Sequence, residues 1–492
     1  MENTTLKSLT AQATKWSSVT EIASRLVLPF INMVLARLLT PEAFGVIATV
    51  NMIVSFAEIF TDAGFQKYLV QHDFEDEEEL DNNTNVAFWT NLLISVVLWL
   101  LIFFFSEQLA ILVGNPGLGN VIVIASLVLP VNAFSSIQMA RYKRDWNFKS
   151  LFYVRLVSIC VPLFVTLPLA YITKSFWALV IGTLSGAVVN AVILTCRSRW
   201  KPKLFFSIKK LKEMFSYSWW IMMESISTWM TSYFDTFIVG IFLSTFYVGI
   251  YKTSMITVNQ IISLITSATS MPLFVALSRL KNDRDALIDM YNNYMQAVAF
   301  FVFPLSIGIW IYRDFITFIL LGSQWKEAAD FIGLWGLLSS ISIVLGTYAN
   351  GLYNAIGKTY ISFLVALINI LYMIPILFWS APLGFETLYI SRSSVRILFV
   401  IIQLLMMSIY IKYPIFSLIK KLLPIIPSTV LMAIVALLLN MISQAYLWNF
   451  VCIFICIFVY FTSMFIINKK LLNNSLQTLG VNIKMLKKSN HS

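Results

Sequence analysis

The sequence predicts an all-α, polytopic membrane protein with about 14 transmembrane helices, arranged as two six-helix bundles plus two C-terminal helices. The first observation behind this prediction is composition. Hydrophobic residues make up 59% and charged residues 12% of the 492 residues, whereas a soluble domain carries about 25% charge. The second is that apolar runs of about 18 residues or more, the length of a membrane span, recur along the whole chain. The third is an internal repeat, which relates the two bundles by a pseudo-twofold axis along the membrane normal.

Fourteen apolar runs separated by polar breaks are the predicted spans. They lie near 17–38, 43–64, 84–105, 119–140, 151–172, 176–196, 214–240, 247–275, 293–312, 331–353, 360–380, 386–411, 423–441 and 447–468. The start of the chain has no short apolar core followed by a small-residue cleavage site, so we expect the first run to be a retained helix. The four cysteines lie in or at the ends of apolar runs, where we expect lipid-compatible side chains and no metal site.

Basic residues are concentrated in every second loop. The densest cluster is the connector 197–213, which holds seven lysines and arginines against one acid, Glu213. Because lysine and arginine keep short loops on the cytoplasmic side, we expect these loops and both termini to be cytoplasmic. The net charge of +11 is then explained by topology and by contact of these loops with anionic lipid headgroups. We therefore expect no nucleic-acid partner. The acidic run 72–81 falls on the same side and is predicted to be a solvated loop.

Two short segments indicate the repeat. Residues 39–47 (LTPEAFGVI) join spans 1 and 2, and residues 243–251 (LSTFYVGIY) join spans 7 and 8, with Leu and Gly at the same spacing. Six spans separate the copies, and because six is even both copies have the same orientation, as in a parallel repeat. The predicted divisions are an N-terminal bundle 1–196, the connector, a C-terminal bundle 214–411, and two extra helices with a basic tail at 412–492.

Polar residues enter the first two spans of each repeat copy on one helical face, at steps of three, four and seven. The four stripes are Ser18, Glu21, Arg25 and Asn32; Asn51, Ser55, Glu58 and Asp62; Tyr217, Glu224, Thr228, Thr231 and Asp235; and Lys252, Asn259, Ser263, Thr266 and Ser270. Charged side chains are expensive inside a bilayer and usually face a cavity or a partner, so the stripes predict a polar chamber between the bundles. The alternative is that polar stripes hold neighbouring helices together.

Three further cations lie within predicted spans. Arg392 and Arg396 are one turn apart in span 12, so they share a face and could bind a diphosphate together. Arg155 lies in span 5, near the cytoplasmic edge. The alternative for all three is that the side chain extends to the nearer membrane surface.

Eight segments are similar, in order and spacing, to those of one transporter family. They are 37–45 (RLLTPEAFG), 62–65 (DAGF), 69–71 (LVQ), 88–91 (FWTN), 141–148 (RYKRDWNF), 235–240 (DTFIVG), 249–251 (GIY) and 272–280 (PLFVALSRL). Over residues 10–400 the chain resembles the polysaccharide (O-antigen and exopolysaccharide) flippases of the multidrug/oligosaccharidyl-lipid/polysaccharide exporter superfamily. The resemblance implies a V-shaped cavity between two six-helix bundles, faced by helices 1, 2, 7 and 8.

The implied function is a flippase for a polyprenyl-diphosphate-linked oligosaccharide, an O-antigen, capsule or exopolysaccharide repeat unit. It would work by alternating access in the bacterial cytoplasmic (inner) membrane. The cations expected to hold the diphosphate are Arg25, Lys252, Arg392, Arg396 and Arg155. The carboxylates open to coupling with a proton or sodium gradient are Glu21, Glu58, Asp62, Glu224 and Asp235. The expected partners are the lipid-linked glycan and membrane lipids, with a glycan polymerase and export machinery as further candidates; no bound cofactor is expected.

Two alternatives remain open. A cation-coupled multidrug antiporter of the same superfamily would favour carboxylates and aromatic residues over cations in its cavity. An enzyme, a glycan polymerase or an acyltransferase, is disfavoured, because acyl transfer usually needs a histidine base and the only histidines are His72 and His491. The sequence also lacks a GxxxxGK[ST] motif, so direct use of ATP is not expected.

Overall fold

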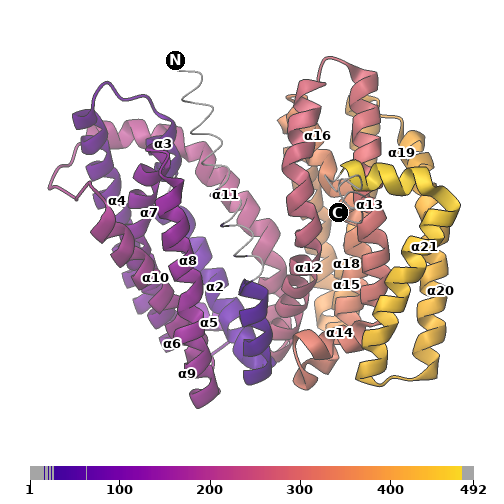
Figure 1. Cartoon of the computed structure of the whole chain (residues 1–492). Coiled ribbons are helices and arrows are strands. Elements are labelled where there is room, and N and C mark those ends of the chain that lie inside the picture. The colour runs from indigo at the N-terminus through magenta and orange to yellow at the C-terminus, as the bar shows by residue number, and fades with distance from the viewer. Residues whose placement is uncertain (1–15, 17–19, 21–23, 25–26, 63, 479–492) are drawn as a thin grey trace, which may run out of the picture. The chain divides into compact units, whose positions relative to one another are not determined.

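The structure is a computed structural model that describes residues 16, 20, 24, 27–62 and 64–478 (Figure 1). Every regular element within these ranges is a helix. By its internal contacts the chain divides into two units, 1–252 and 253–492, and the division falls inside one long helix. Units defined by internal contacts need not begin and end where two sequence repeats do, so these units do not test the predicted repeat boundary. The predicted boundary at the connector 197–213 therefore stays a prediction.

Unit 1 (residues 1–252) contains the helices of the first predicted bundle and the hairpin that opens the second. They are Val27–Leu38, α2 (Pro41–Asp62), α3 (Phe65–Gln71), α4 (Glu77–Phe104), α5 (Ser106–Leu112), α6 (Gly119–Ser126), α7 (Val128–Arg144), α8 (Phe148–Phe164), α9 (Thr166–Thr173), α10 (Trp177–Arg197), α11 (Ile208–Phe242) and the start of α12 (Thr245–Arg279). Two breaks do not end a span. The pairs α6–α7 and α8–α9 each form one apolar span of 26 residues.

The two repeat segments, 39–47 and 243–251, lie against each other in unit 1. A Cβ on Gly45 would lie 1.9 Å from the carbonyl oxygen of Thr245, and a Cβ on Gly249 would lie 1.8 Å from that of Pro41. Pro41 and Thr245 are equivalent in the repeat, as are Gly45 and Gly249, since both pairs are 204 positions apart. The contact is thus reciprocal, and it requires glycine because a side chain would overlap the backbone of the other copy. This explains why both copies of the repeat carry a glycine at this position.

Unit 2 (residues 253–492) contains the remaining helices. They are the rest of α12, α13 (Arg284–Ile311), α14 (Arg313–Leu320), η1 (Ser323–Ala328), α15 (Ala329–Ser342), η2 (Ile343–Thr347), α16 (Tyr348–Ala355), α17 (Thr359–Ser380), η3 (Ala381–Leu383), α18 (Phe385–Ile411), α19 (Ile415–Leu422), η4 (Leu423–Ile425), α20 (Ile426–Ile442) and α21 (Tyr446–Thr478). Its main apolar core surrounds α13, whose Tyr291, Met295 and Phe300 are fully buried. The element η2 is one turn of π-helix, a feature that is frequent at functional sites.

Each of the fourteen predicted spans overlaps a helix, or two or three consecutive helices, in the described ranges, and several helices begin or end six to ten residues beyond the predicted bounds. Eleven helices in the described ranges are long and apolar enough to cross a membrane, and α12, bent by 44° near Pro272, makes a twelfth. The other two predicted spans are the apolar helix Val27–Leu38 and α11, a 35-residue helix that carries one of the polar stripes. The all-α polytopic fold class is confirmed.

Candidate functional site

Three of the predicted site groups cannot be placed. Glu21 and Arg25 lie outside the described residues, and so does the side chain of Asp62. The other predicted residues divide between the units. Arg155, Lys252, Glu58, Glu224 and Asp235 belong to unit 1, and Arg392 and Arg396 belong to unit 2.

A cavity of about 750 Å³ in unit 1 contains Arg155. It lies among the helix Val27–Leu38, α7, α8 and α10. Its polar lining includes the amides Asn32, Asn132 and Asn190 and a second cation, Lys143. An apolar shell with a few amides and cations is typical of a ligand pocket, and 750 Å³ falls within the usual range of about 300–1,000 Å³. The stripe residue Asn32 therefore faces a cavity, but this cavity lies within unit 1, whereas the sequence predicts a chamber between the two bundles, which stays a prediction.

The stripe on α2 lines a second cavity in unit 1, of about 310 Å³. Asn51, Ser55 and Glu58 share it with Tyr233 of α11. Glu58 accepts a hydrogen bond of 2.9 Å from Nδ2 of Asn132, the asparagine that also lines the larger cavity. The carboxylate of Glu58 is thus linked to the Arg155 cavity through the side chain of Asn132.

Lys252 and Asp235 lie together at the α11–α12 hairpin. Lys252 is half-buried, and its Nζ donates to the carbonyl oxygen of Ser232 (2.8 Å) and to Oγ1 of Thr236 (3.3 Å). Asp235 is 1% exposed and accepts from the Thr236 N–H (2.7 Å) and from the Tyr251 hydroxyl (3.0 Å). Thr236 thus contacts both charged residues. The carboxylate is satisfied within the hairpin, and its role in ion coupling stays a prediction.

Glu224 is on the surface of unit 1. Its side chain is 73% exposed, and its carboxylate lies 3.8 Å from Nζ of Lys67 on α3. Such an exposed ion pair contributes about 0–1 kcal/mol. Glu224 is therefore open to solvent or ligand.

In unit 2, Arg392 and Arg396 lie over the ring of one buried tryptophan. Their guanidinium carbons are 5.1 Å and 3.7 Å from the ring centroid of Trp335 on α15. Trp335 in turn donates through Nε1 to Asn259 at 3.4 Å. The two cations therefore lie against the same aromatic ring, as their one-turn spacing on α18 allows.

The stripe on α12 lines a cavity of about 350 Å³ in unit 2. Asn259, Ser263, Thr266 and Ser270 all border it. The opposite wall includes Thr347 of the π-helical turn and Tyr348. All the stripe residues that follow Lys252 on this helix thus face a single cavity.

Cysteine and acidic residues do not combine into a metal centre in the described ranges, where no group of three or more His, Cys, Asp or Glu side chains could hold an ion. Cys452 and Cys456 are buried in α21, and the hydroxyl of Tyr312 lies 3.7 Å from Sγ of Cys456.

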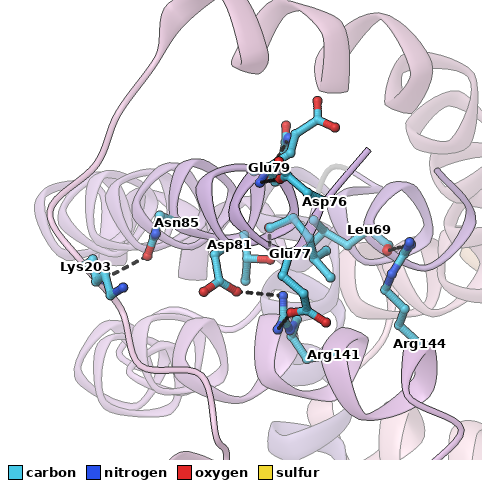
Figure 2. A network of polar contacts seen from close by, with 12 residues as sticks. Leu69, Asp76, Glu77, Glu79, Asp81, Asn85, Arg141, Arg144 and Lys203 are labelled. Atoms are coloured by element: carbon cyan, nitrogen blue, oxygen red, sulfur yellow. Dashed lines mark hydrogen bonds and ion pairs between the residues drawn. The ribbon is translucent and has the colours of Figure 1, made fainter. Parts of the chain in front are cut away.

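The acidic run 72–81 differs from its prediction. Residues 77–81 form the first turn of α4, capped by Asp76, which accepts from the Glu79 N–H at 2.6 Å. Arg141 of α7 pairs with Asp81 at 2.9 Å and with Glu77 at 3.7 Å (Figure 2). The prediction of a loop is therefore wrong for residues 77–81, which are helical, whereas the side chain of Glu77 stays solvated, at 89% exposed.

The same network reaches the connector. Lys210 lies 3.6 Å from Glu79. The Lys203 N–H donates to Oδ1 of Asn85 at 2.8 Å (Figure 2). Arg144 donates to the carbonyl oxygens of Leu69 and His72 at 2.9 Å and 2.7 Å. Sequence reasoning missed these contacts, although the opposite charges of 72–81 and 141–144 were a signal that could have found them.

Tyr68 on α3 lies beside this network. Burial, with repulsion from the carboxylates of Glu213 and Glu79, raises the pKa of its hydroxyl. Its ring stacks on His72 at 4.7 Å.

Comparison with known proteins identifies a family and related folds. The family model described as "Polysaccharide biosynthesis protein" matches residues 34–330. The succinoglycan biosynthesis transport protein ExoT of Rhizobium meliloti is 25% identical over 68% of this chain and 67% of its own length. The lipopolysaccharide biosynthesis protein WzxC of Escherichia coli is 21% identical over 70% of each chain. Among solved structures, the lipid II flippase MurJ in an inward closed conformation shares the fold, with a TM-score of 0.71 and 17% identity over 92% of this chain and 99% of that one.

Proposed function

The chain belongs to the polysaccharide biosynthesis protein family, and from this premise we propose that it is a flippase for a polyprenyl-diphosphate-linked oligosaccharide. The substrate is a repeat unit of an O-antigen, a capsule or an exopolysaccharide. The chain moves it across the membrane by alternating access. The transport and lipopolysaccharide names of the relatives support this class of substrate. The names of these relatives also favour a transporter over an enzyme.

The observation that carries the proposal is the 750 Å³ cavity with Arg155 and Lys143 inside a membrane-spanning unit. A diphosphate cannot enter an apolar environment unpaired, because desolvation of an unpaired charge costs several kcal/mol or more. Cations among amides supply both the counter-charge and hydrogen bonds to the sugar. The lipid tail stays in the bilayer, where it loses no contact with hydrocarbon.

Within this proposal the diphosphate is bound by Lys252 and by four arginines, Arg25, Arg155, Arg392 and Arg396. Guanidinium groups bind phosphate oxygens in bidentate fashion, and the face of Trp335 holds Arg392 and Arg396 in place for such contacts. Arg155 acts in the large cavity. Lys252 acts as a point charge at the α11–α12 hairpin. Arg25 completes the set by its place in the first stripe.

A proton or sodium gradient drives the cycle in this proposal. Glu58 has the best support among the candidate carboxylates, because it lines a polar cavity and contacts Asn132 of the larger one. Glu224 is accessible, whereas Asp235 is already bonded within its hairpin. Glu21 and Asp62 remain candidates from their places in the first and second stripes.

The proposed setting is the bacterial inner membrane, with both termini cytoplasmic. The basic loops support this orientation, since they would face the anionic cytoplasmic leaflet. A glycan polymerase and export machinery would receive the flipped product.

A gene deletion complemented with variants tests the proposal. The substitution Arg155→Ala should lower surface polysaccharide and cause a lipid-linked intermediate to accumulate, while drug resistance stays unchanged. The matched control is Arg199→Ala, an exposed arginine of the connector. Normal surface glycan with altered drug resistance would favour the antiporter instead.

A further inference from the structure

Unit 2 contains a polar cavity of about 290 Å³, and none of the residues that line it is a predicted site residue. It lies where membrane spans end, between α14 and the short turn that joins α20 to α21. In Figure 1, α14 lies at the end of its unit opposite to α19, whose last turn carries Lys420 and Lys421. On the proposed orientation the cavity therefore opens to the extracytoplasmic side.

Two buried residues that line this cavity each carry a polar atom without a partner among the described residues. Thr317 is 2% exposed, and its Oγ1 has no hydrogen bond. Asn449 is 7% exposed, and its Oδ1 is likewise unbonded, although its Nδ2 donates to the Gln444 carbonyl oxygen at 3.4 Å. Buried polar groups are usually paired, so a ligand in the cavity that supplies hydrogen bonds would satisfy both residues.

The rest of the lining selects the chemistry of that ligand. Its polar side chains are Asp314, Thr317, Ser323, Lys326, Asn440, Gln444 and Asn449, with the two tyrosines Tyr312 and Tyr446. One carboxylate and one ammonium cancel, so the cavity does not favour an anion such as a diphosphate. Amides and hydroxyls pair well with neighbouring hydroxyl groups, because each can donate and accept.

An aromatic pair forms one edge of the cavity. The rings of Phe318 and Tyr446 are stacked, with centroids 3.9 Å apart and planes 9° from parallel. Tyr446 is 53% exposed and presents an apolar face beside the amides. Amides next to an aromatic face suit a ring that is polar at its edge and apolar on its faces.

We propose that this cavity binds one sugar ring of a glycan on the extracytoplasmic side. Its 290 Å³ lies just below the range of drug-sized pockets, about 300–1,000 Å³, and is suited to a monosaccharide. The choice of a sugar over another uncharged polyol rests on the proposed function. The ring can belong to the headgroup of a lipid-linked glycan after translocation, or to free glycan.

Saturation-transfer NMR on the full chain in lipid nanodiscs tests the site. The probes are methyl β-D-glucopyranoside, methyl β-D-galactopyranoside and D-glucuronate. We expect signal for a neutral sugar. The signal should fall about fivefold in Thr317→Val and Asn449→Leu, as the loss of one hydrogen bond implies. It should be unchanged in the matched control Asn354→Leu, an exposed amide on α16.

Tyr446→Ala serves as a second variant, because an exposed ring can be removed without unfolding the unit. It should weaken the same signal. The proposal is overturned if no neutral sugar gives signal above empty nanodiscs, if the variants bind as well as wild type, or if short-chain phosphatidylglycerol alone displaces the probe. Since binding is measured without transport, this failure leaves the flippase proposal standing.

Surface glycan in cells that carry the binding-defective variants identifies the source of the ring. Reduced export indicates that the site holds the lipid-linked headgroup. Normal export with lost binding indicates free or polymerised glycan.

Discussion

Replacing Gly249 with alanine perturbs the reciprocal contact between the repeat segments 39–47 and 243–251. The added Cβ would lie 1.8 Å from the Pro41 carbonyl oxygen, 2.7 Å from its carbon and 3.0 Å from the Gly45 nitrogen. To reach even 3.0 Å from that oxygen, the two backbones must separate by roughly 1.2 Å. Because backbone atoms cannot rotate away as a side chain can, the cost should lie at the upper end of the about 1–3 kcal/mol typical of overpacking.

Thermal unfolding of the purified chain in detergent measures this cost. Gly45→Ala should destabilise by a similar amount, since its Cβ would lie 1.9 Å from the Thr245 oxygen. The double variant should cost less than the sum of the two, because a single separation of the segments relieves both overlaps. The matched control is Gly308→Ala in α13, where nothing lies within 4 Å of the added carbon. It should be neutral or stabilising. Wild-type stability of Gly249→Ala, or full additivity, would refute the reciprocal contact.

Three further substitutions test other parts of the account. Arg141→Ala should destabilise unit 1 by about 1–2 kcal/mol in the same unfolding assay, since the half-buried carboxylate of Asp81 loses its counter-ion; an unchanged unfolding temperature would contradict the network. Trp335→Leu should reduce glycan export more than Trp335→Phe, because a phenyl ring still offers a face to the two arginines; equal losses would argue that the ring only fills space. Glu58→Gln, which keeps an acceptor for its hydrogen bond, should abolish the response of transport in vesicles to an imposed ion gradient, whereas the exposed Glu386→Gln should not; a retained response would remove Glu58 as the coupling group.

Much of the fold follows from apolar run length alone. The positions of spans such as 293–312 and 386–411 agree with α13 and α18 because a helix that crosses hydrocarbon must satisfy its own backbone hydrogen bonds. The repeat was also visible in sequence, since the glycines that permit the close contact keep their spacing. The reciprocal contact itself was not visible, because spacing does not indicate which backbones meet.

The candidate site was predictable only in part. The stripe on α12 faces one cavity because a step of three or four returns to the same helical face. Periodicity identifies a face but not its neighbour, so it could not show that Asp235 is satisfied by Thr236 and Tyr251. Charge counting also missed the folded start of α4, because the partner of Asp81 lies sixty positions away at Arg141. The polar cavity beside Thr317 has no sequence signal, since its lining comes from the ends of several separate helices between α13 and α21.

Transfer of a labelled polyprenyl-diphosphate oligosaccharide between leaflets of reconstituted vesicles tests the central claim most directly. We predict that the purified chain transfers the lipid, and that Arg155→Ala slows transfer about tenfold, the effect of losing about 1.4 kcal/mol of interaction with the diphosphate. Arg199→Ala should match wild type. Transfer no faster than in protein-free vesicles would contradict the account.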